Sequence, residues 1–518
     1  MTASGARRWW ALAGVTLAVL AAGMDGTVLN VALPTLATAL HASESDLQWF
    51  SAGYLMVIAA AVLPAGLLGD RYGRKRVMLA SLALFGAGSA ACALARSPGE
   101  FLAARAVLGL AGAGVIVMAV TALTVLFSEE ERPKAVGIWA AANFLAVPIG
   151  PVFGGWLLTH YWWGWVFLMN VPVALLGLIA AALLVPESRA PRPPGLDPLG
   201  VAASTAGLVG MTYGLIEAGV QGWGAAGALA PLVAGLALLV LFFLWESRLS
   251  SLPGGQPLID PVLFRSASFT WGVLLMTVVV IAMIGILFTM PQYFQGVAGT
   301  NAMGSGLRLM PMVGGLILGA VPADRVARRV GAKLTVALGC AVLGGGLLLG
   351  GATAVGSSGS FVGAWMAIAG LGMGLALATA TSAALSELST EHAGVGAAVI
   401  QAVKNVGGPF GTAILGSVLN ASYRDRVAVG GLPGSAVEAV RESVFAGVAV
   451  AQRLGSQPLL DSVRSAFASG LERVLVVSAA VALAGAVLAL VFLPRAVTIP
   501  SRPAPARPRQ QAPVPVEH

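Results

Sequence analysis

The chain consists largely of apolar runs of about 20 residues, and this repetition constrains its fold more than any other feature. Each run can form one helical crossing of a bilayer, because a helix rises about 1.5 Å per residue and the hydrocarbon core is about 30 Å thick. Only 10% of the residues are charged and the mean hydropathy is +0.86, whereas soluble domains have about 25% charged residues. We therefore predict a helical integral membrane protein.

We expect fourteen membrane spans. The first apolar run follows Arg7 and Arg8 and continues past Asp25 to Leu40, which favours an uncleaved first helix over a cleaved secretory signal. The fourteen runs begin near Trp9, Phe50, Val77, Phe101, Ala135, Gly164, Pro198, Ala225, Phe269, Met303, Lys333, Phe361, Gly396 and Glu472.

The distribution of Lys and Arg predicts the orientation of these spans. If the amino terminus is cytoplasmic, most of the 30 basic residues fall in cytoplasmic segments, as expected for the loops of a membrane protein. An even number of spans then places both termini in the cytoplasm. The net charge of +8 is largely explained by this asymmetry, and nothing in it favours nucleic-acid binding.

Two turns of similar sequence suggest a duplicated body. Residues 66–76 read GLLGDRYGRKR after span two, and residues 319–333 read GAVPADRVARRVGAK after span ten. A solvated basic loop is the simpler interpretation of either turn alone, but the repetition indicates two equivalent halves. The expected organisation is a first six-helix bundle (1–185), a cytoplasmic linker (186–197), an inserted helix pair (198–245), a second linker (246–268), a second six-helix bundle (269–493) with a long outer loop (420–471), and a disordered cytoplasmic tail (494–518).

One carboxylate interrupts the first span. Asp25 lies between uncharged residues from Trp9 to Leu40, and a charge near the bilayer centre costs at least about 2.5 to 3.5 kcal/mol on insertion scales. Arg105 lies in span four in the same way. Desolvation favours the protonated form of a carboxylate, so Asp25 can bind and release a proton; a purely structural ion pair, or a solvated position near the surface, is the alternative.

Five motifs in chain order resemble the major facilitator superfamily, specifically its fourteen-span drug:proton antiporter branch. The turn at 66–76 is similar to the superfamily's signature turn, and span one contains Asp25-Gly-Thr27-Val-Leu-Asn30-Val-Ala-Leu-Pro34. Span four contains Arg105-Ala-Val-Leu108-Gly109, span five contains Gly137, Ala146 and Gly150-Pro151-Val-Phe-Gly154-Gly155, and span six contains Trp163-Gly164-Trp165 and Asn170. The branch usually has glutamine, glycine and arginine where this chain has Leu108, Ala146 and Gly164.

The resemblance implies a fold and a set of site residues. The fold would be the all-α major facilitator fold, with two six-helix bundles and two inserted helices. The resemblance assigns Arg105 a role in coupling to Asp25. Glu217, near the outer end of span seven, is a second possible acid, although a position facing the outer water layer is the favoured interpretation. The remaining site residues are a first-helix motif (Thr27, Asn30, Pro34), a cytoplasmic latch between the halves (Gly66, Asp70, Arg71, Gly73, Arg74, Asp324, Arg325) and an antiporter hinge (Gly137, Pro148, Gly150, Pro151, Gly154, Gly155).

The expected function is proton-coupled export of bulky amphipathic drugs, antibiotics or secondary metabolites across the bacterial cytoplasmic membrane. The expected partners are a small-molecule substrate, protons and membrane lipid, for a monomer with no cofactor and the proton gradient as energy source. Cys92 and Cys340 lie in apolar runs and imply no disulfide or metal site. A same-fold importer, a transporter of one specific metabolite and a non-transport membrane protein remain alternatives, and no residue pattern favours an enzyme.

Overall fold

The computed structural model describes residues 5–128, 131–189, 197–252, 257–258, 261–386, 393–430 and 432–494, and these segments contain helices but no strands. Twelve helices within them are long and apolar enough to cross a membrane. Two further helices, α5 and α16, have 29 and 34 residues, but part of their side chains lies outside the described set. The prediction of an all-helical membrane protein is confirmed, whereas the count of fourteen spans stays a prediction.

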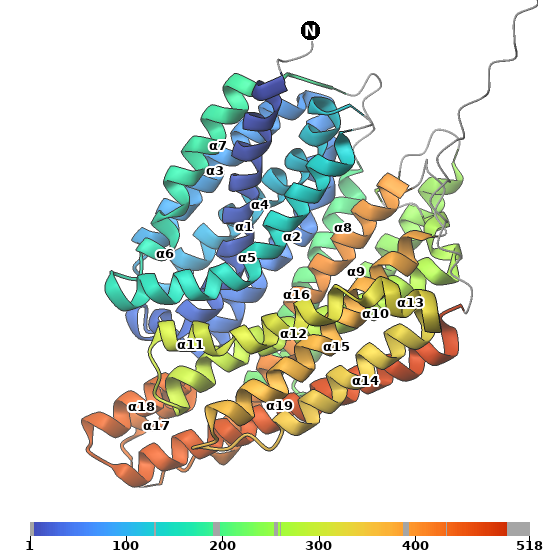
Figure 1. The fold of residues 1–518 in the computed structure, drawn as a ribbon. Coiled ribbons are helices and arrows are strands. Elements are labelled where there is room, and N and C mark those ends of the chain that lie inside the picture. The colour runs from blue at the N-terminus through green and yellow to red at the C-terminus, as the bar shows by residue number, and fades with distance from the viewer. Residues whose placement is uncertain are drawn as a thin grey trace, which may run out of the picture.

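The chain forms two bundles and an intervening helix pair (Figure 1). The first bundle contains α1 (Gly5–Ala39), α2 (Glu44–Tyr72), α3 (Arg74–Leu94), α4 (Pro98–Leu126), α5 (Arg132–His160), α6 (Trp165–Leu168) and α7 (Asn170–Leu184). The pair is α8 (Pro198–Gln221) and α9 (Ala226–Ser251). The second bundle contains η1 (Pro261–Arg265), α10 (Ala267–Gln292), η2 (Tyr293–Val297), α11 (Ala302–Arg308), α12 (Met310–Ala320), α13 (Ala323–Val330), α14 (Ala332–Gly350), α15 (Gly359–Ser386), α16 (Ala393–Arg426), α17 (Gly434–Glu442), α18 (Val444–Arg453) and α19 (Gln457–Phe492).

The two bundles pack their helices in the same pattern. In the first bundle α1 packs on α5 and α7, α2 on α4, and α3 on α4 and α7; in the second, α10 packs on α16 and α19, α12 on α15, and α14 on α15 and α19. Between the bundles, α2 contacts α16 while α5 contacts α11. These equivalent pairs agree with the duplicated turn in the sequence.

Glycines bring the inserted pair together. A Cβ added at Gly207, Gly210 or Gly214 of α8 would lie within 3.1 Å of atoms of α9, so these small residues allow close helix contact. α8 also packs against both α2 and α16 and therefore touches both bundles. α9 is mostly exposed, since only 11% of its most apolar stretch is buried.

Hydrogen bonds between the bundles gather toward one side of the molecule. We call the side where α1 begins the near side and the side where α1 ends the far side. Among the described residues, these hydrogen bonds are Gln295 Nε2 to Val31 O (3.0 Å), Gln292 Nε2 to Glu44 Oε1 (3.3 Å) and the hydroxyl pair Ser51 and Thr412 (3.5 Å). They lie in the far-side halves of α1 and α2, so the structure is closed on the far side.

Three predicted boundaries differ from the structure. α9 continues to Ser251, six residues beyond the expected end of the inserted pair. The segment expected as an outer loop, 420–471, with helix-compatible stretches such as Val437 to Leu454, contains the helices α17 and α18. Its limits differ, because α16 runs to Arg426 and α19 begins at Gln457 rather than near Glu472. Ser443 and Ser456 cap α18 and α19, which explains where these two helices begin. All of the expected tail beyond Pro494 lies outside the described residues.

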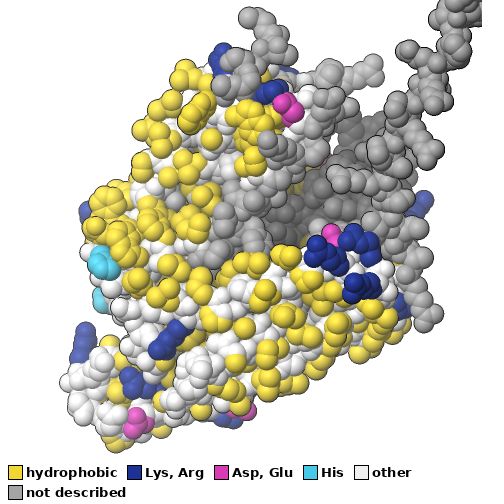
Figure 2. Space-filling model, viewed as in Figure 1, with side chains coloured by type: hydrophobic (Ala, Val, Ile, Leu, Met, Phe, Trp, Pro, Cys, Tyr) yellow, Lys and Arg dark blue, Asp and Glu magenta, His cyan; other side chains and the backbone are white. Residues whose placement is uncertain are grey.

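Side-chain types are segregated on the visible face of the molecule. Figure 2 shows hydrophobic side chains over the flanks of both bundles and basic side chains gathered toward their ends. One basic group belongs to α13, where Arg325, Arg328 and Arg329 are exposed. Apolar flanks with charged ends are expected for a protein whose sides contact lipid.

Candidate functional site

Asp25 and Arg105 form a buried ion pair inside the first bundle. The Arg105 Nη1 and Asp25 Oδ2 atoms are 2.5 Å apart, and the two residues are 2% and 0% exposed. Asp25 lies on α1 and Arg105 on α4. The pairing agrees with the expectation that a fixed positive charge lies beside the carboxylate, and it also means that Asp25 does not stand alone in the apolar interior.

Two further side chains hold this pair. Asn170 at the start of α7 donates from Nδ2 to Asp25 Oδ1 (3.2 Å), and the Arg105 guanidinium lies 3.9 Å from the ring centroid of Tyr54 on α2. The Tyr54 hydroxyl donates to the carbonyl of Ala22 (3.3 Å). Arg105 Nε and Nη2 are buried without a hydrogen-bond partner, so the guanidinium retains donors for another acceptor.

The first-helix motif connects Asp25 to neighbouring helices. Thr27 donates from Oγ1 to the carbonyl of Ala146 on α5 (3.2 Å), and Asn30 donates from Nδ2 to the carbonyl of Gly26 (3.3 Å). Pro34 is buried inside α1. One turn before Pro34, the Val31 carbonyl accepts the bond from Gln295 of the second bundle. α1 therefore carries both the ion pair and a contact across the two bundles.

The glycines of the antiporter motif bring α5 close to two partners. A Cβ at Gly150 would overlap Thr27 Oγ1, and one at Gly154 would lie 2.5 Å from Val28 Cγ1. The close contact of α5 with α1 therefore leaves no room for a larger residue at either position. A Cβ at Gly155 would lie 2.6 Å from the carbonyl oxygen of Ala302 on α11. Pro151 is buried and its carbonyl faces Gly306 of α11. Gly137 and Pro148 lie outside the described side chains.

The turn between α2 and α3 is attached to its own bundle. Gly73 has φ +112°, a conformation that favours glycine, and it ends α2 immediately before α3. Arg74 forms an ion pair with Asp70 at 2.9 Å, while Arg71 is exposed and lies over the Tyr72 ring. Gly66 faces Val117 of α4. Among the described residues, no ion pair or hydrogen bond joins this turn to the second bundle in this far-side-closed state, and the latch between the bundles stays a prediction.

Glu187 secures this turn from the end of α7. Its Oε1 accepts from the Lys75 backbone N–H (3.2 Å), and its Oε2 lies 3.8 Å from Arg76 Nε. A Cβ at Gly73 would lie 2.7 Å from Glu187 Oε1. Sequence reasoning missed Glu187, although an acid in the linker on the same predicted side as the basic residues Arg71, Arg74, Lys75 and Arg76 was an available signal.

The second turn repeats the backbone but not the ion pair. Gly331 has φ +89° and separates α13 from α14, as Gly73 separates α2 from α3. Asp324 and Arg325 are both exposed on α13. The duplication is therefore visible in the position of the left-handed glycine.

Glu217 lies apart from the ion pair. It is half-buried near the end of α8 and accepts a hydrogen bond from Gln221 Nε2 (2.6 Å) on the same helix. No hydrogen bond or ion pair among the described residues joins it to Asp25 or Arg105. Its role in coupling stays a prediction.

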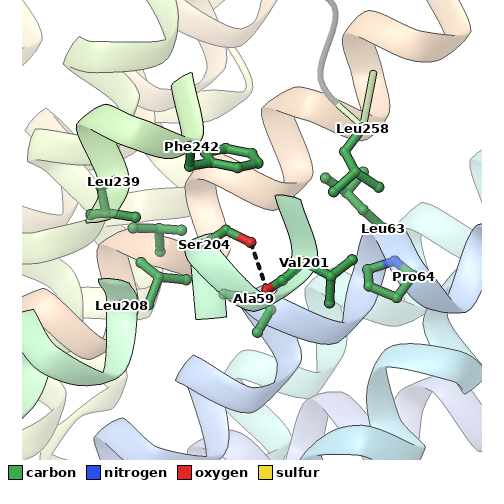
Figure 3. Close-up of a pocket in the computed structure, with 11 residues that line it drawn as sticks. Ala59, Leu63, Pro64, Val201, Ser204, Leu208, Leu239, Phe242 and Leu258 are labelled. Atoms are coloured by element: carbon green, nitrogen blue, oxygen red, sulfur yellow. Dashed lines mark hydrogen bonds between the residues drawn. The ribbon is translucent and has the colours of Figure 1, made fainter. Parts of the chain in front are cut away.

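An apolar pocket of about 190 Å³ lies between α2, α8, α9 and α16 (Figure 3). At one wall, Ser204 Oγ donates to the carbonyls of Val201 (3.2 Å) and Gly200 (2.8 Å), both on its own helix α8. The pocket is lined by Ala59, Ala60, Leu63, Pro64, Val201, Ser204, Leu208, Leu239, Phe242, Leu258 and Val406. It borders the inserted pair and is separate from the Asp25 ion pair.

A sequence model described as the Major Facilitator Superfamily matches residues 15–412. The chain belongs to this superfamily. Relatives with named activities match 80% or more of this chain. The tetracenomycin C resistance and export protein of Streptomyces glaucescens is 34% identical, over 93% of this chain and 91% of its own length. The multidrug efflux pump LfrA of Mycolicibacterium smegmatis is 31% identical, over 94% and 96%, and a probable actinorhodin transporter of Streptomyces coelicolor is 32% identical, over 80% and 72%.

Solved structures of other major facilitator proteins share the fold. A bacterial homologue of the human lysosomal transporter Spinster, in an inward-facing and unoccupied conformation, aligns with a TM-score of 0.69 and 16% identity, over 97% of this chain and 100% of that chain. A D-xylose-proton symporter aligns with a TM-score of 0.59 and 15% identity, over 94% and 98%. The family and the fold confirm the resemblance drawn from the sequence motifs. They are those of transporters rather than enzymes.

Two residues of the ion-pair site were not among the predicted site residues of this major facilitator protein. Asn170 belongs to the quoted span-six motif, so its signal was present in the sequence. Tyr54 is one of 6 tyrosines in the chain, and only the packing of α2 on α4 reveals its position under Arg105.

Proposed function

We propose that the chain is a proton-coupled secondary active transporter that exports bulky amphipathic drugs, antibiotics or secondary metabolites across the bacterial cytoplasmic membrane. The observation that carries the proposal is the buried pair of Asp25 and Arg105 on two membrane helices. A charged residue at such depth marks a proton or ion pathway more often than a structural contact. The names of the relatives, which refer to antibiotic export and multidrug efflux, support the substrate class.

In this proposal Asp25 is the proton switch. A proton from the external solution binds the carboxylate, which becomes neutral and loses its attraction to Arg105. Arg105 remains charged, because a guanidinium does not deprotonate in proteins, and its field favours release of the proton to the cytoplasm once the near side is open. α1 transmits the change, since it also contacts α5 through Thr27 and the second bundle through Val31.

Alternating access moves the substrate. The near side is cytoplasmic, as the positions of the basic residues favour, and both termini lie there. The two bundles rock about a central substrate site, so the far side opens as the near side closes. Asp70 and Arg71 then leave their present contacts and form the latch against the second bundle near Asp324 and Arg325, while α5 bends at its glycines and prolines.

A drug-susceptibility panel tests the proposal. Cells expressing the chain should tolerate several unrelated amphipathic drugs better than cells expressing Asp25→Asn, and inverted vesicles should take up the same drugs only while a proton gradient exists. Asp425→Asn, which changes an exposed aspartate, is the matched control and should behave like the parent. Unchanged, uncoupler-sensitive transport by Asp25→Asn would show that Asp25 is structural. Increased rather than decreased drug accumulation in cells would identify an importer.

A further inference from the structure

A second buried carboxylate lies in the contact between the bundles. Glu44 is the first residue of α2, on the far side, and is 5% exposed. Gln292 at the end of α10, which is fully buried, donates from Nε2 to Glu44 Oε1 (3.3 Å). Glu44 and Gln292 belong to different bundles, so this hydrogen bond exists only while the far side is closed.

The side chains around Glu44 include amides, and no ion pair among the described residues gives it a partner cation. Gln48 lies one turn further along α2, on the same face, and is also fully buried. Its side chain packs against α16, where a Cβ at Gly416 would lie 2.7 Å from Gln48 Cδ. The amide oxygens of Gln48 and Gln292 are buried without hydrogen-bond partners, and both can accept a bond from a protonated carboxyl group.

Titratable groups on the neighbouring elements do not neutralise Glu44. α10 carries no charged residue and contributes the Gln292 amide, which does not titrate. From α16, Tyr423 lies close enough to interact electrostatically with Glu44, but its hydroxyl donates to the carbonyls of Val440 (2.8 Å) and Ser443 (3.3 Å). On α2, Asp46 accepts hydrogen bonds from Ser43. The ion pairs of the described residues include neither Glu44 nor Arg424 of α16.

These contacts favour different protonation states in the two conformations of the transporter. A buried ionised carboxylate carries a desolvation cost of several kcal/mol, and no ion pair of the described residues offsets it at Glu44. A neutral carboxyl group still accepts from Gln292 and can also donate to an amide oxygen. When the far side opens, Glu44 separates from Gln292 and meets water. The ionised form is then the stable one at neutral pH.

We propose that Glu44 is a second proton-binding site, located in the far-side contact between the bundles. The inference rests on the proposed alternating access. Glu44 takes a proton from the external solution as the far side closes and returns it there when that side opens. Acid outside the cell therefore favours the state that faces the cytoplasm and loads substrate. The sign follows from linkage, because the far-side-closed state binds one more proton than the far-side-open state.

Spin labels across the far side test this proposal. The labels are attached at Arg96→Cys in the first bundle and Val355→Cys in the second, two exposed positions on the far side. The distance between the two labels increases when the far side opens. Cys92 and Cys340 are replaced first, so that only the two introduced cysteines carry labels. Between about pH 5.5 and about pH 8.5 the ratio of open to closed molecules should rise at least about tenfold in the parent, since one linked proton allows up to about tenfold per pH unit.

Glu44→Gln should keep the far side closed, with a ratio that changes less than about twofold over the same range. Glu442→Gln, an exposed far-side replacement, should titrate like the parent. The proposal is overturned if Glu44→Gln retains the parent's pH dependence. Should Glu44→Gln not fold, Glu44→Asp serves instead, and it must shift the midpoint of the transition, since an unmoved midpoint is equally contrary to the proposal.

Asp25→Asn separates this inference from the proposed function. In that variant the far side should still close in acid through Glu44, although proton-driven export is lost. Loss of the pH-dependent closure in Asp25→Asn, with Glu44 intact, would assign the titration to Asp25 and overturn the role of Glu44. Far-side closure that depends on Glu44 in a protein showing no proton-driven drug transport would contradict only the proposed function.

Discussion

Asp25 and Arg105 illustrate how a costly pair of charges is held in an apolar bundle. Each neutralises the other, Asn170 satisfies a second carboxylate oxygen, and Tyr54 offers its ring face to the guanidinium. Removing one partner leaves the other charge buried and unpaired, which destabilises the fold, whereas removing both charges also removes this desolvation cost. Single and double replacements therefore separate a structural role from a coupling role.

We expect Arg105→Ala to lower the free energy of unfolding by about 3 to 5 kcal/mol, because it leaves Asp25 buried and unpaired. Asp25→Asn combined with Arg105→Gln should recover most of that loss without recovering proton-driven export. Thermal unfolding in detergent and transport in vesicles measure the two quantities.

The control for these variants is Arg8→Ala, which breaks the pair with Glu131 where the side chains are 28% and 33% exposed. A partly exposed pair contributes only about 0 to 1 kcal/mol, so this change should be nearly neutral for stability. If the double variant exported drug in response to a proton gradient, the ion pair would be structural only.

Helix α5 depends on residues without side chains at its contacts. Gly150 and Gly154 allow it to approach α1, and Gly155 allows it to approach α11 of the other bundle. The Gly155 contact differs from the first two because it can exist only while the far side is closed. A larger residue there should therefore change the balance between conformations.

Gly155→Ala should shift the protein toward the far-side-open state. The added Cβ would lie 2.6 Å from the Ala302 carbonyl oxygen and 2.7 Å from Met303 Cα, both of which are backbone atoms, and overpacking costs about 1 to 3 kcal/mol. Spin-label distances across the far side measure the shift. Gly314→Ala on α12, where a Cβ would meet nothing within 4 Å, should leave the distances unchanged; equal effects of the two changes would contradict the assignment.

The sequence predicts single helices well and contacts between helices poorly. Apolar runs predicted the positions of the membrane helices, and the repeated turn marked the two equivalent turns that contain Gly73 and Gly331. Both features depend on residues that are close together in the chain. Glu44 was missed because an acid beside Ser43 and Asp46 resembles an ordinary capped helix start. Its hydrogen-bond partner Gln292 on α10 lies 248 residues away along the chain.

At the scale of the whole molecule, the far-side contact can be locked covalently. The hydroxyl oxygens of Ser51 and Thr412 are 3.5 Å apart and belong to opposite bundles. Ser51→Cys with Thr412→Cys, in a chain lacking Cys92 and Cys340, should form a disulfide, because thiols at these positions can reach the required bond length with little backbone movement.

We expect this disulfide to lower the rate of drug export at least about tenfold, because a locked far side cannot release substrate. Reduction of the disulfide should restore export. Each single cysteine variant is the control and should export normally under oxidising conditions. Mass spectrometry confirms the bond, and full export by the oxidised double variant would mean that the bundles need not separate at this contact.

The inserted pair meets both bundles, yet it cannot follow both when they rock. Ser417 of α16 donates a hydrogen bond to the Leu215 carbonyl of α8, whereas α8 meets α2 through apolar side chains such as Met56, Ala59 and Leu208. The polar attachment indicates that α8 and α9 travel with the second bundle and slide over α2. The apolar pocket between Ala59 and Val201 would then change its volume in every cycle, and a lipid chain or detergent tail lodged in it would slow turnover without touching the substrate.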